Sequence, residues 1–78
     1  MLLPLSERQE ETLQVIRTFI REKNYPPTIP EVQECLSISN PGAVHKCFQA
    51  LEKKGYILRT KGMHRGLDLT QEAKEYLQ

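Results

Sequence analysis

The sequence has little of what several classes of protein require. It contains two cysteines, too few for a disulfide framework, which favours a reducing cytosol where both stay as thiols. No apolar run approaches the roughly 20 residues that span a bilayer. The start, MLLPLSER, is too short for a secretory signal and lacks its early basic segment. These absences predict a cytoplasmic protein without a membrane partner.

Chemistry-bearing motifs are also missing. Seventy-eight residues predict one small domain, 1–78, with a modest core and no separate catalytic lobe. There is no glycine-rich phosphate loop, no serine near a plausible base and no pair of carboxylates within a pocket-forming segment. The cysteines and histidines fit no common zinc spacing, and Cys47 lies on the apolar side of its helix, opposite His45. We expect no catalytic residue, metal, cofactor or small-molecule ligand.

Charge is unevenly distributed along the chain. The net charge is only +1, well short of a strongly basic nucleic-acid binder. Residues 45–66, however, hold six lysines and arginines against one glutamate, a balance of +5, and the remainder has a balance of −4. This asymmetry would orient the domain on a polyanion.

Two capping boxes predict the first two helices. Residues 6–9, SERQ, open a helix that runs to about Lys23, where the sequence NYPP ends it. Residues 28–31, TIPE, open a short helix to about Leu36. Tyr25 is expected to pack back on the core. The apolar residues that we expect the short helix to bury are Val32, Cys35 and Leu36.

A third helix and a hairpin follow. Asn40 is placed to cap a helix that runs to about Lys54, with a proline at its first position and Gly55 as a left-handed stop. The runs YILR and GLDL predict two strands around a glycine-containing turn at 61–64, and Thr70 a final helix over 71–77. This order predicts a mainly α protein with a small β-hairpin, a winged helix-turn-helix.

The exposed face of the third helix carries the functional prediction. The tight turn before it is typical of a helix-turn-helix, whose second helix enters a DNA major groove. Its first residues, PGA, are small enough for the backbone to approach the groove. Lys46 suits guanine acceptors, Gln49 suits adenine, and Asn40 suits a phosphate or a base edge. The helical spacing places on one face Gly42, His45, Lys46 and Gln49.

The basic hairpin and the helix ends are expected to hold phosphates. A basic turn with two glycines suits a wing laid on the DNA backbone or in a minor groove. For Lys53 and Lys54, phosphate contact and stabilisation of the helix C-terminus both stay open. The expected backbone contacts are Thr28, Ser39, Lys53, Lys54, Arg59, Lys61, His64 and Arg65.

From about Leu5 to Leu69 the sequence resembles the N-terminal DNA-binding domain of LexA-type repressors. Four motifs carry the resemblance, in order and at the right spacing: PPT-x-x-EV, NP-x-A, L-x-x-KGYI and G-x-x-RG. The resemblance implies a transcriptional repressor whose third helix enters the major groove, with the wing near the minor groove. The family's base-reading positions match Asn40, Gly42, Ala43, His45 and Lys46.

Two departures from that family matter. Its familiar residues at these five positions are roughly Ser, Asn, Ala, Glu and Glu, so His45 and Lys46 predict a different base preference. LexA-type repressors also carry a C-terminal domain with a serine–lysine self-cleaving dyad that dimerises the protein. The sequence ends at Gln78, so an excised domain and a natural short form that cannot self-cleave both stay open. In a short form the final helix either dimerises through Ala73, Tyr76 and Leu77 or closes the core.

We expect sequence-specific binding of duplex DNA and transcriptional regulation, by repression. A module of this size makes few base contacts, so two copies, a homodimer on DNA, are expected to occupy a two-fold symmetric site. The alternative is a winged helix that serves as a protein-interaction or adaptor module. That alternative predicts an exposed apolar patch through Tyr76 and Leu77 and little salt-dependent affinity for DNA.

Overall fold

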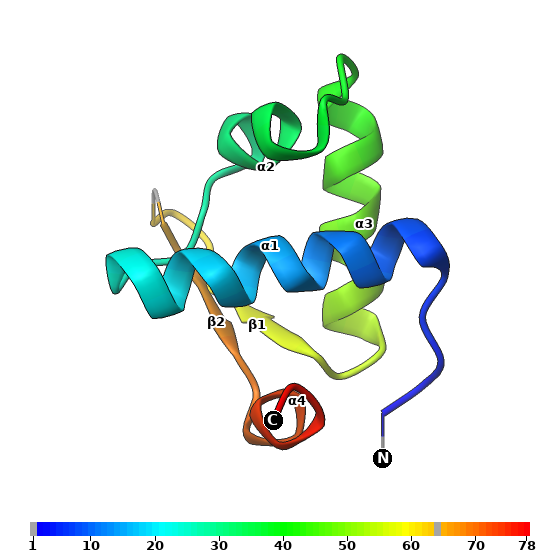
Figure 1. The fold of residues 1–78 in the computed structure, drawn as a ribbon, viewed down its shortest axis with the longest axis vertical. Coiled ribbons are helices and arrows are strands. Elements are labelled where there is room, and N and C mark those ends of the chain that lie inside the picture. The colour runs from blue at the N-terminus through cyan, green and yellow to red at the C-terminus, as the bar shows by residue number, and fades with distance from the viewer. Residues whose placement is uncertain (1, 64) are drawn as a thin grey trace.

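The computed structural model describes residues 2–63 and 65–78, and its elements follow the predicted order (Figure 1). The winged helix-turn-helix prediction is therefore confirmed. His64, predicted as a phosphate contact, lies outside the described residues. None of the helices in the described ranges is long and apolar enough to cross a membrane. The elements are α1 (Glu7–Lys23), α2 (Ile29–Leu36), α3 (Pro41–Lys53), β1 (Ile57–Arg59), β2 (Leu67–Leu69) and α4 (Gln71–Tyr76).

The first two helices begin at their predicted capping boxes. The Ser6 hydroxyl accepts a hydrogen bond from the Gln9 amide at 3.3 Å, and the Gln9 side chain accepts one from the Ser6 amide at 3.1 Å. In α2, the Glu31 carboxylate accepts from the Thr28 amide at 2.8 Å. Each box satisfies amides that have no partner within the helix, which fixes where α1 and α2 start.

The third helix begins and ends as predicted. The Asn40 side chain accepts from the Gly42 amide at 2.8 Å. At the other end Gly55 has φ of 94°, and the Tyr56 amide donates to the Leu51 carbonyl at 2.9 Å. This six-residue bridge is the Schellman arrangement, which satisfies a carbonyl at the helix end and turns the chain sharply into β1.

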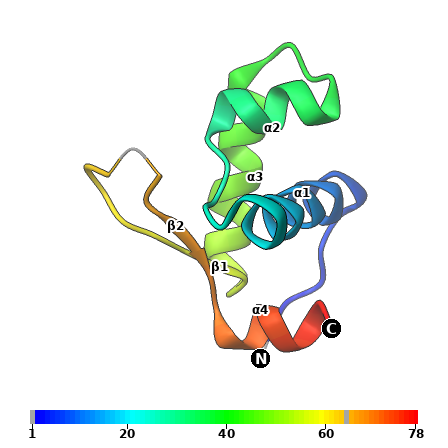
Figure 2. The ribbon, with the colours of Figure 1, turned by 60° about the vertical axis from the view of Figure 1, so that its left-hand side comes forward.

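The hairpin is antiparallel and joins the body at its base. Ile57 pairs with Leu69, and both side chains are buried in the core. Toward the tip, the Thr60 amide donates to the Gly66 carbonyl at 2.7 Å. A Cβ atom at Gly66 would collide with the Thr60 carbonyl oxygen, so glycine permits this close approach. Figure 2 shows the hairpin projecting from the body beside α3.

One core unites the elements, and α4 closes it. α1 crosses α3 above α4, whose Ala73 is fully buried (Figure 1). Leu77, immediately after the helix, is 8% exposed, so these two residues close the core and do not form a free dimer face. The core is made of Leu13, Ile16, Val32, Val44, Phe48, Leu51, Tyr56, Ile57, Leu69, Ala73 and Leu77.

The chain's first residues lie along the same end of the molecule. The Tyr56 hydroxyl donates to the Leu3 carbonyl at 2.5 Å, and the Lys54 ammonium donates to the Pro4 carbonyl at 2.9 Å. Tyr76 stays 49% exposed while its hydroxyl donates to Glu10 at 2.6 Å. The apolar patch of Tyr76 and Leu77 that an interaction module would present is not formed, because Leu77 is buried.

Two packing predictions need correction. Cys47 is buried, as expected, but Cys35 is exposed. Cys35 lines a surface groove with Val15 and Phe19 of α1, whereas Val32 is buried in the core and Leu36 is half-buried against it. Tyr25 is also partly exposed and packs on the Phe19 ring, with centroids 6.4 Å apart, outside the main core.

Candidate nucleic-acid interface

The predicted reading face of α3 is exposed. Gly42, His45, Lys46 and Gln49 all face solvent, while Ala43 is half-buried and Asn40 is exposed at the cap. The opposite face of α3 is buried, as its apolar spacing predicts, through Val44, Cys47, Phe48 and Leu51. The helix therefore presents small and polar groups outward over its first turns. Their contact with DNA stays a prediction.

The turn between α2 and α3 is held by the side chain and backbone of Gln33. Its amide group donates to the carbonyls of Ile38 at 3.4 Å and Ser39 at 3.3 Å. Its own carbonyl accepts from the Ile38 amide at 2.9 Å, and Ser37 adopts a left-handed φ of 55°. These bonds fix the angle at which the N-terminus of α3 leaves α2, and Ser39 remains exposed beside it.

Three lysines of the basic segment are available to a polyanion. Lys46, Lys53 and Lys61 are exposed, and none forms an ion pair among the residues that the structure describes. Arg59 differs, because it is half-buried and its guanidinium lies 5.7 Å from the centroid of the Phe48 ring. An ammonium without a protein partner can neutralise a phosphate at little cost in lost contacts.

Two other predicted phosphate contacts already have partners. The Lys54 ammonium donates to Gln9 at 2.7 Å as well as to Pro4. The Arg65 guanidinium donates to both carboxylate oxygens of Glu31, at 2.7 and 3.0 Å. These bonds do not test the predicted DNA contacts, but they give both cations a place in the protein's own structure.

Arg65 lies at the centre of a cluster that we name the latch: Arg65 with Glu31, Pro26 and Tyr25. Besides the carboxylate, its guanidinium donates to the Pro26 carbonyl at 2.8 Å and lies 4.3 Å from the centroid of the Tyr25 ring. The hydrogen bonds from Arg65, with those from Thr28, lower the pKa of Glu31 from 4.5 to about 2. The carboxylate is therefore charged throughout the physiological range.

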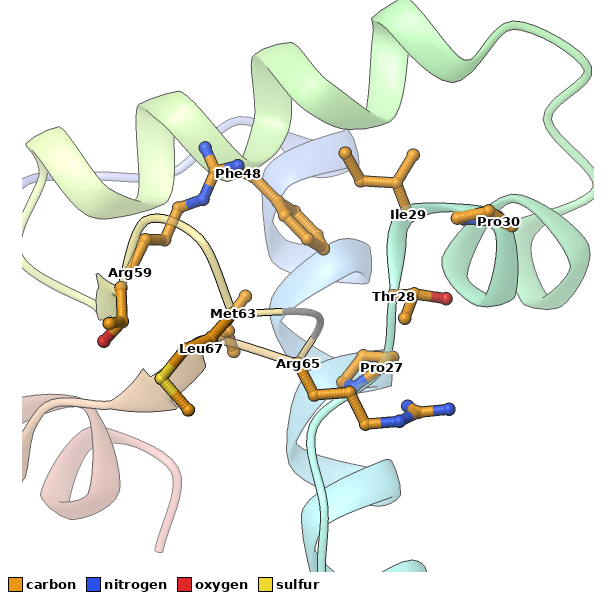
Figure 3. A pocket seen from close by; sticks show the side chains of 11 residues that line it. Pro27, Thr28, Ile29, Pro30, Phe48, Arg59, Met63, Arg65 and Leu67 are labelled. Atoms are coloured by element: carbon orange, nitrogen blue, oxygen red, sulfur yellow. The ribbon is translucent and has the colours of Figure 1, made fainter.

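A cleft of about 290 Å³ separates the hairpin from α2 and α3. Figure 3 shows Ile29 and Phe48 on one side, Arg59 and Met63 on the other, and Arg65 reaching past Pro27. The hydroxyl of Thr28, a predicted backbone contact, is engaged in the α2 cap. Sequence reasoning missed the latch, although the motifs PPT-x-x-E and G-x-x-RG each contain one of its charged members.

Two helices joined by a tight turn, followed by a basic hairpin, define a winged helix-turn-helix protein. The family model described as LexA DNA binding domain matches residues 2–66. The chain belongs to the LexA DNA-binding domain family, as the resemblance of its motifs implies.

Individual relatives agree with this assignment. LexA repressors of Citrifermentans bemidjiense and a Geobacter species are 41% and 43% identical, over 90% and 87% of this chain. The LexA repressor of Thermobifida fusca is 37% identical over 83% of the chain. The matched regions are 35%, 34% and 26% of these three relatives, so the chain spans about a quarter to a third of their length.

Proposed function

We propose that this chain binds duplex DNA in a sequence-specific manner and represses transcription from the sites that it occupies. The observation that carries the proposal is the exposed polar face of α3, the second helix of a helix-turn-helix. The relatives named LexA repressor support the same function. A regulator of this kind acts by occupying DNA, which fits a cytoplasmic location.

The reading face works through side-chain geometry. Gly42 and Ala43 let the backbone of α3 approach the groove, and His45, Lys46 and Gln49 reach the base edges. Because the Asn40 oxygen accepts from the Gly42 amide, the Asn40 side-chain NH₂ group is left to donate to a base or a phosphate. Lys46 donates to the acceptors of guanine, and Gln49 pairs with adenine.

Cations around that face supply affinity that does not depend on sequence. Lys53 and Lys61 neutralise phosphates on either side of α3, with Arg59 and Ser39 near the same backbone. Thr28, at the N-terminus of α2, is a further predicted contact to the same phosphate backbone. Lys54 and His64 are the remaining cations that we assign to phosphates, and Arg65, also predicted from the amino-acid sequence, is considered separately below.

Two copies on a two-fold symmetric site would supply the specificity that one small module lacks. A single module of this kind buries roughly 600–1,000 Å² on DNA, less than most specific complexes. A homodimer on DNA doubles the base contacts and places equivalent α3 helices about one helical turn apart.

The experiment that tests the function is a selection followed by titration. The protein is used to select duplexes from a random library, and a labelled selected duplex is titrated between about 50 and 200 mM salt with a random competitor. Preference for a symmetric selected site, with affinity that falls steeply with salt, is the expected result. Failure to enrich any duplex, with no binding at low salt, would overturn the proposal and favour an interaction module.

A further inference from the structure

The outer half of the hairpin has little packing to hold it in place. Its base is anchored by Ile57 and Leu69, which belong to the core. Beyond Arg59, the residues from Thr60 to Met63 are all exposed, and the cleft separates this half from α2 and α3. Core packing therefore sets where the hairpin starts but not where its outer half lies relative to the reading face.

The latch supplies that missing connection. Among the described residues of the segment 60–66, Arg65 alone has a side chain hydrogen-bonded to the rest of the domain. Two parallel charge-assisted bonds to one carboxylate fix orientation as well as distance, which a single bond cannot do. The Tyr25 ring beneath the guanidinium restricts it further.

The other end of the latch is connected to α3, the helix that carries the predicted reading face. Glu31 accepts hydrogen bonds from Arg65 and from the Thr28 amide that begins α2, so one carboxylate serves both the hairpin and the helix cap. α2 in turn determines the direction of α3 through the turn held by Gln33. A continuous set of hydrogen bonds thus runs from the hairpin through α2 to the turn that leads into α3.

We infer that Arg65 is a positioning residue, which sets the hairpin at a fixed distance from the exposed face of α3 and does not itself neutralise a phosphate. The inference deepens the proposed function and rests on it. Paired with Glu31, Arg65 adds no net charge to the surface, so its contribution to counterion release is small. Its effect on DNA binding passes through Lys61, whose ammonium the latch holds within reach of the DNA backbone.

A double-mutant cycle tests this inference. The duplex selected by the wild-type protein is titrated with Arg65→Gln, Glu31→Gln and the double variant. Gln at position 31 preserves the capping box, because Gln serves there as well as Glu. We expect each single variant to bind about tenfold more weakly, in the middle of the range for coupled pairs, and the double variant no more weakly than either.

The matched control comes from the same hairpin. Lys61→Gln should reduce the slope of log affinity against log salt by about 0.9 in the wild-type background. In the Arg65→Gln background it should have almost no further effect, because the hairpin no longer holds Lys61 at the DNA. If Arg65 served only to stabilise the fold, Arg65→Gln would lower the folded fraction, as measured by circular dichroism. The effect of Lys61→Gln on the salt slope would then stay unchanged.

Arg65→Lys separates charge from geometry. An ammonium keeps the charge but cannot make two parallel bonds to Glu31, so a positioning role predicts the same loss as Arg65→Gln. Three results would each overturn the inference: Arg65→Lys binding like wild type, Glu31→Gln binding as tightly as wild type, or an undiminished effect of Lys61→Gln in the Arg65→Gln background. A wild-type protein that selects no duplex would instead remove the proposed function itself.

Discussion

The exposed face of α3 and the hairpin are both basic, yet their cations differ in availability. Lys46 on α3 is exposed and has no ion pair among the described residues, whereas Arg65 in the hairpin is bound by a carboxylate, a carbonyl and an aromatic ring. The same formal charge is thus free to meet a partner at Lys46, and at Lys61 in the hairpin, but is committed to the fold at Arg65. Charge along a sequence locates a surface, but the partners of each cation decide its role.

The two regions also differ in how their backbone is fixed. The reading face lies on a helix of thirteen residues with a buried side, so its side chains have a rigid base. The hairpin has three-residue strands and depends on one close backbone approach and on the latch. Perturbations of the hairpin should therefore alter its position, and perturbations of α3 should alter base preference.

The largest effect is expected from Gly66→Ala, on the hairpin side. The new Cβ atom would meet the Thr60 carbonyl, and we expect a loss of about 3 kcal/mol of unfolding free energy, the upper range for overpacking. Urea unfolding measures it. Gly62→Ala is the control, since its φ of 81° is strained but no atom lies within 4 Å, and about 1 kcal/mol is expected. Equal losses at both glycines would contradict the collision.

The next effect is on the α3 side. Lys46→Ala should weaken binding to the selected duplex about 30-fold, or about 2 kcal/mol, and relax the preference at one base pair. Competition between the selected duplex and single-base variants measures both. Lys53→Ala is the control, expected to weaken all duplexes alike and to reduce the salt slope by about 0.9. If Lys46→Ala lowered affinity equally on every sequence, Lys46 would not read a base.

A smaller effect separates capping from reading at Asn40. Asn40→Ala should destabilise the protein by about 1 kcal/mol, because the Gly42 amide loses its acceptor. Asn40→Ser keeps a capping oxygen but lacks the amide donor, so stability should be retained while base preference weakens. Thermal unfolding and the competition assay measure the two properties. A serine variant as destabilised as the alanine variant would show that the cap does not account for the loss.

The smallest effect is a pH dependence of the latch. Because the pKa of Glu31 falls from 4.5 to about 2 on folding, its stabilisation is complete above pH 4.5 and is lost as the pH falls toward 2. At this partly exposed pair we expect about 1 kcal/mol. Unfolding free energies of wild type and Glu31→Gln, measured by urea across this range, should differ above pH 4.5 and converge near 2. A difference that persisted at the lowest pH would exclude the negative charge of Glu31 as its source.

Local signals made most of the fold predictable. Each cap and the amide that it binds lie within three residues, as at Ser6, Thr28 and Asn40, so the helix starts can be found from sequence. The glycine stop at Gly55 is equally local. The apolar spacing of α3 likewise predicts which of its faces is exposed, because the helical period is fixed.

Long-range pairing was not predictable. Arg65 and Glu31 are 34 residues apart, and Lys54 and Pro4 are 50 apart. The sequence therefore shows these cations but does not indicate which groups bind them. Cys35 shows the same limit, since its position on the apolar side of α2 does not reveal that α1 leaves it uncovered. Availability of a side chain depends on tertiary contacts, and one sequence alone does not display them.

The arrangement of the chain ends has a practical consequence. The first described residues are bound to the end of α3 at Lys54 and Tyr56, and α4 lies at that same end, far from the first turn of α3 (Figures 1 and 2). A dye, an affinity handle or a flexible tether attached after Gln78 would project away from the reading face. Surface immobilisation and single-molecule fluorescence through that position would therefore leave the helix-turn-helix accessible to a duplex.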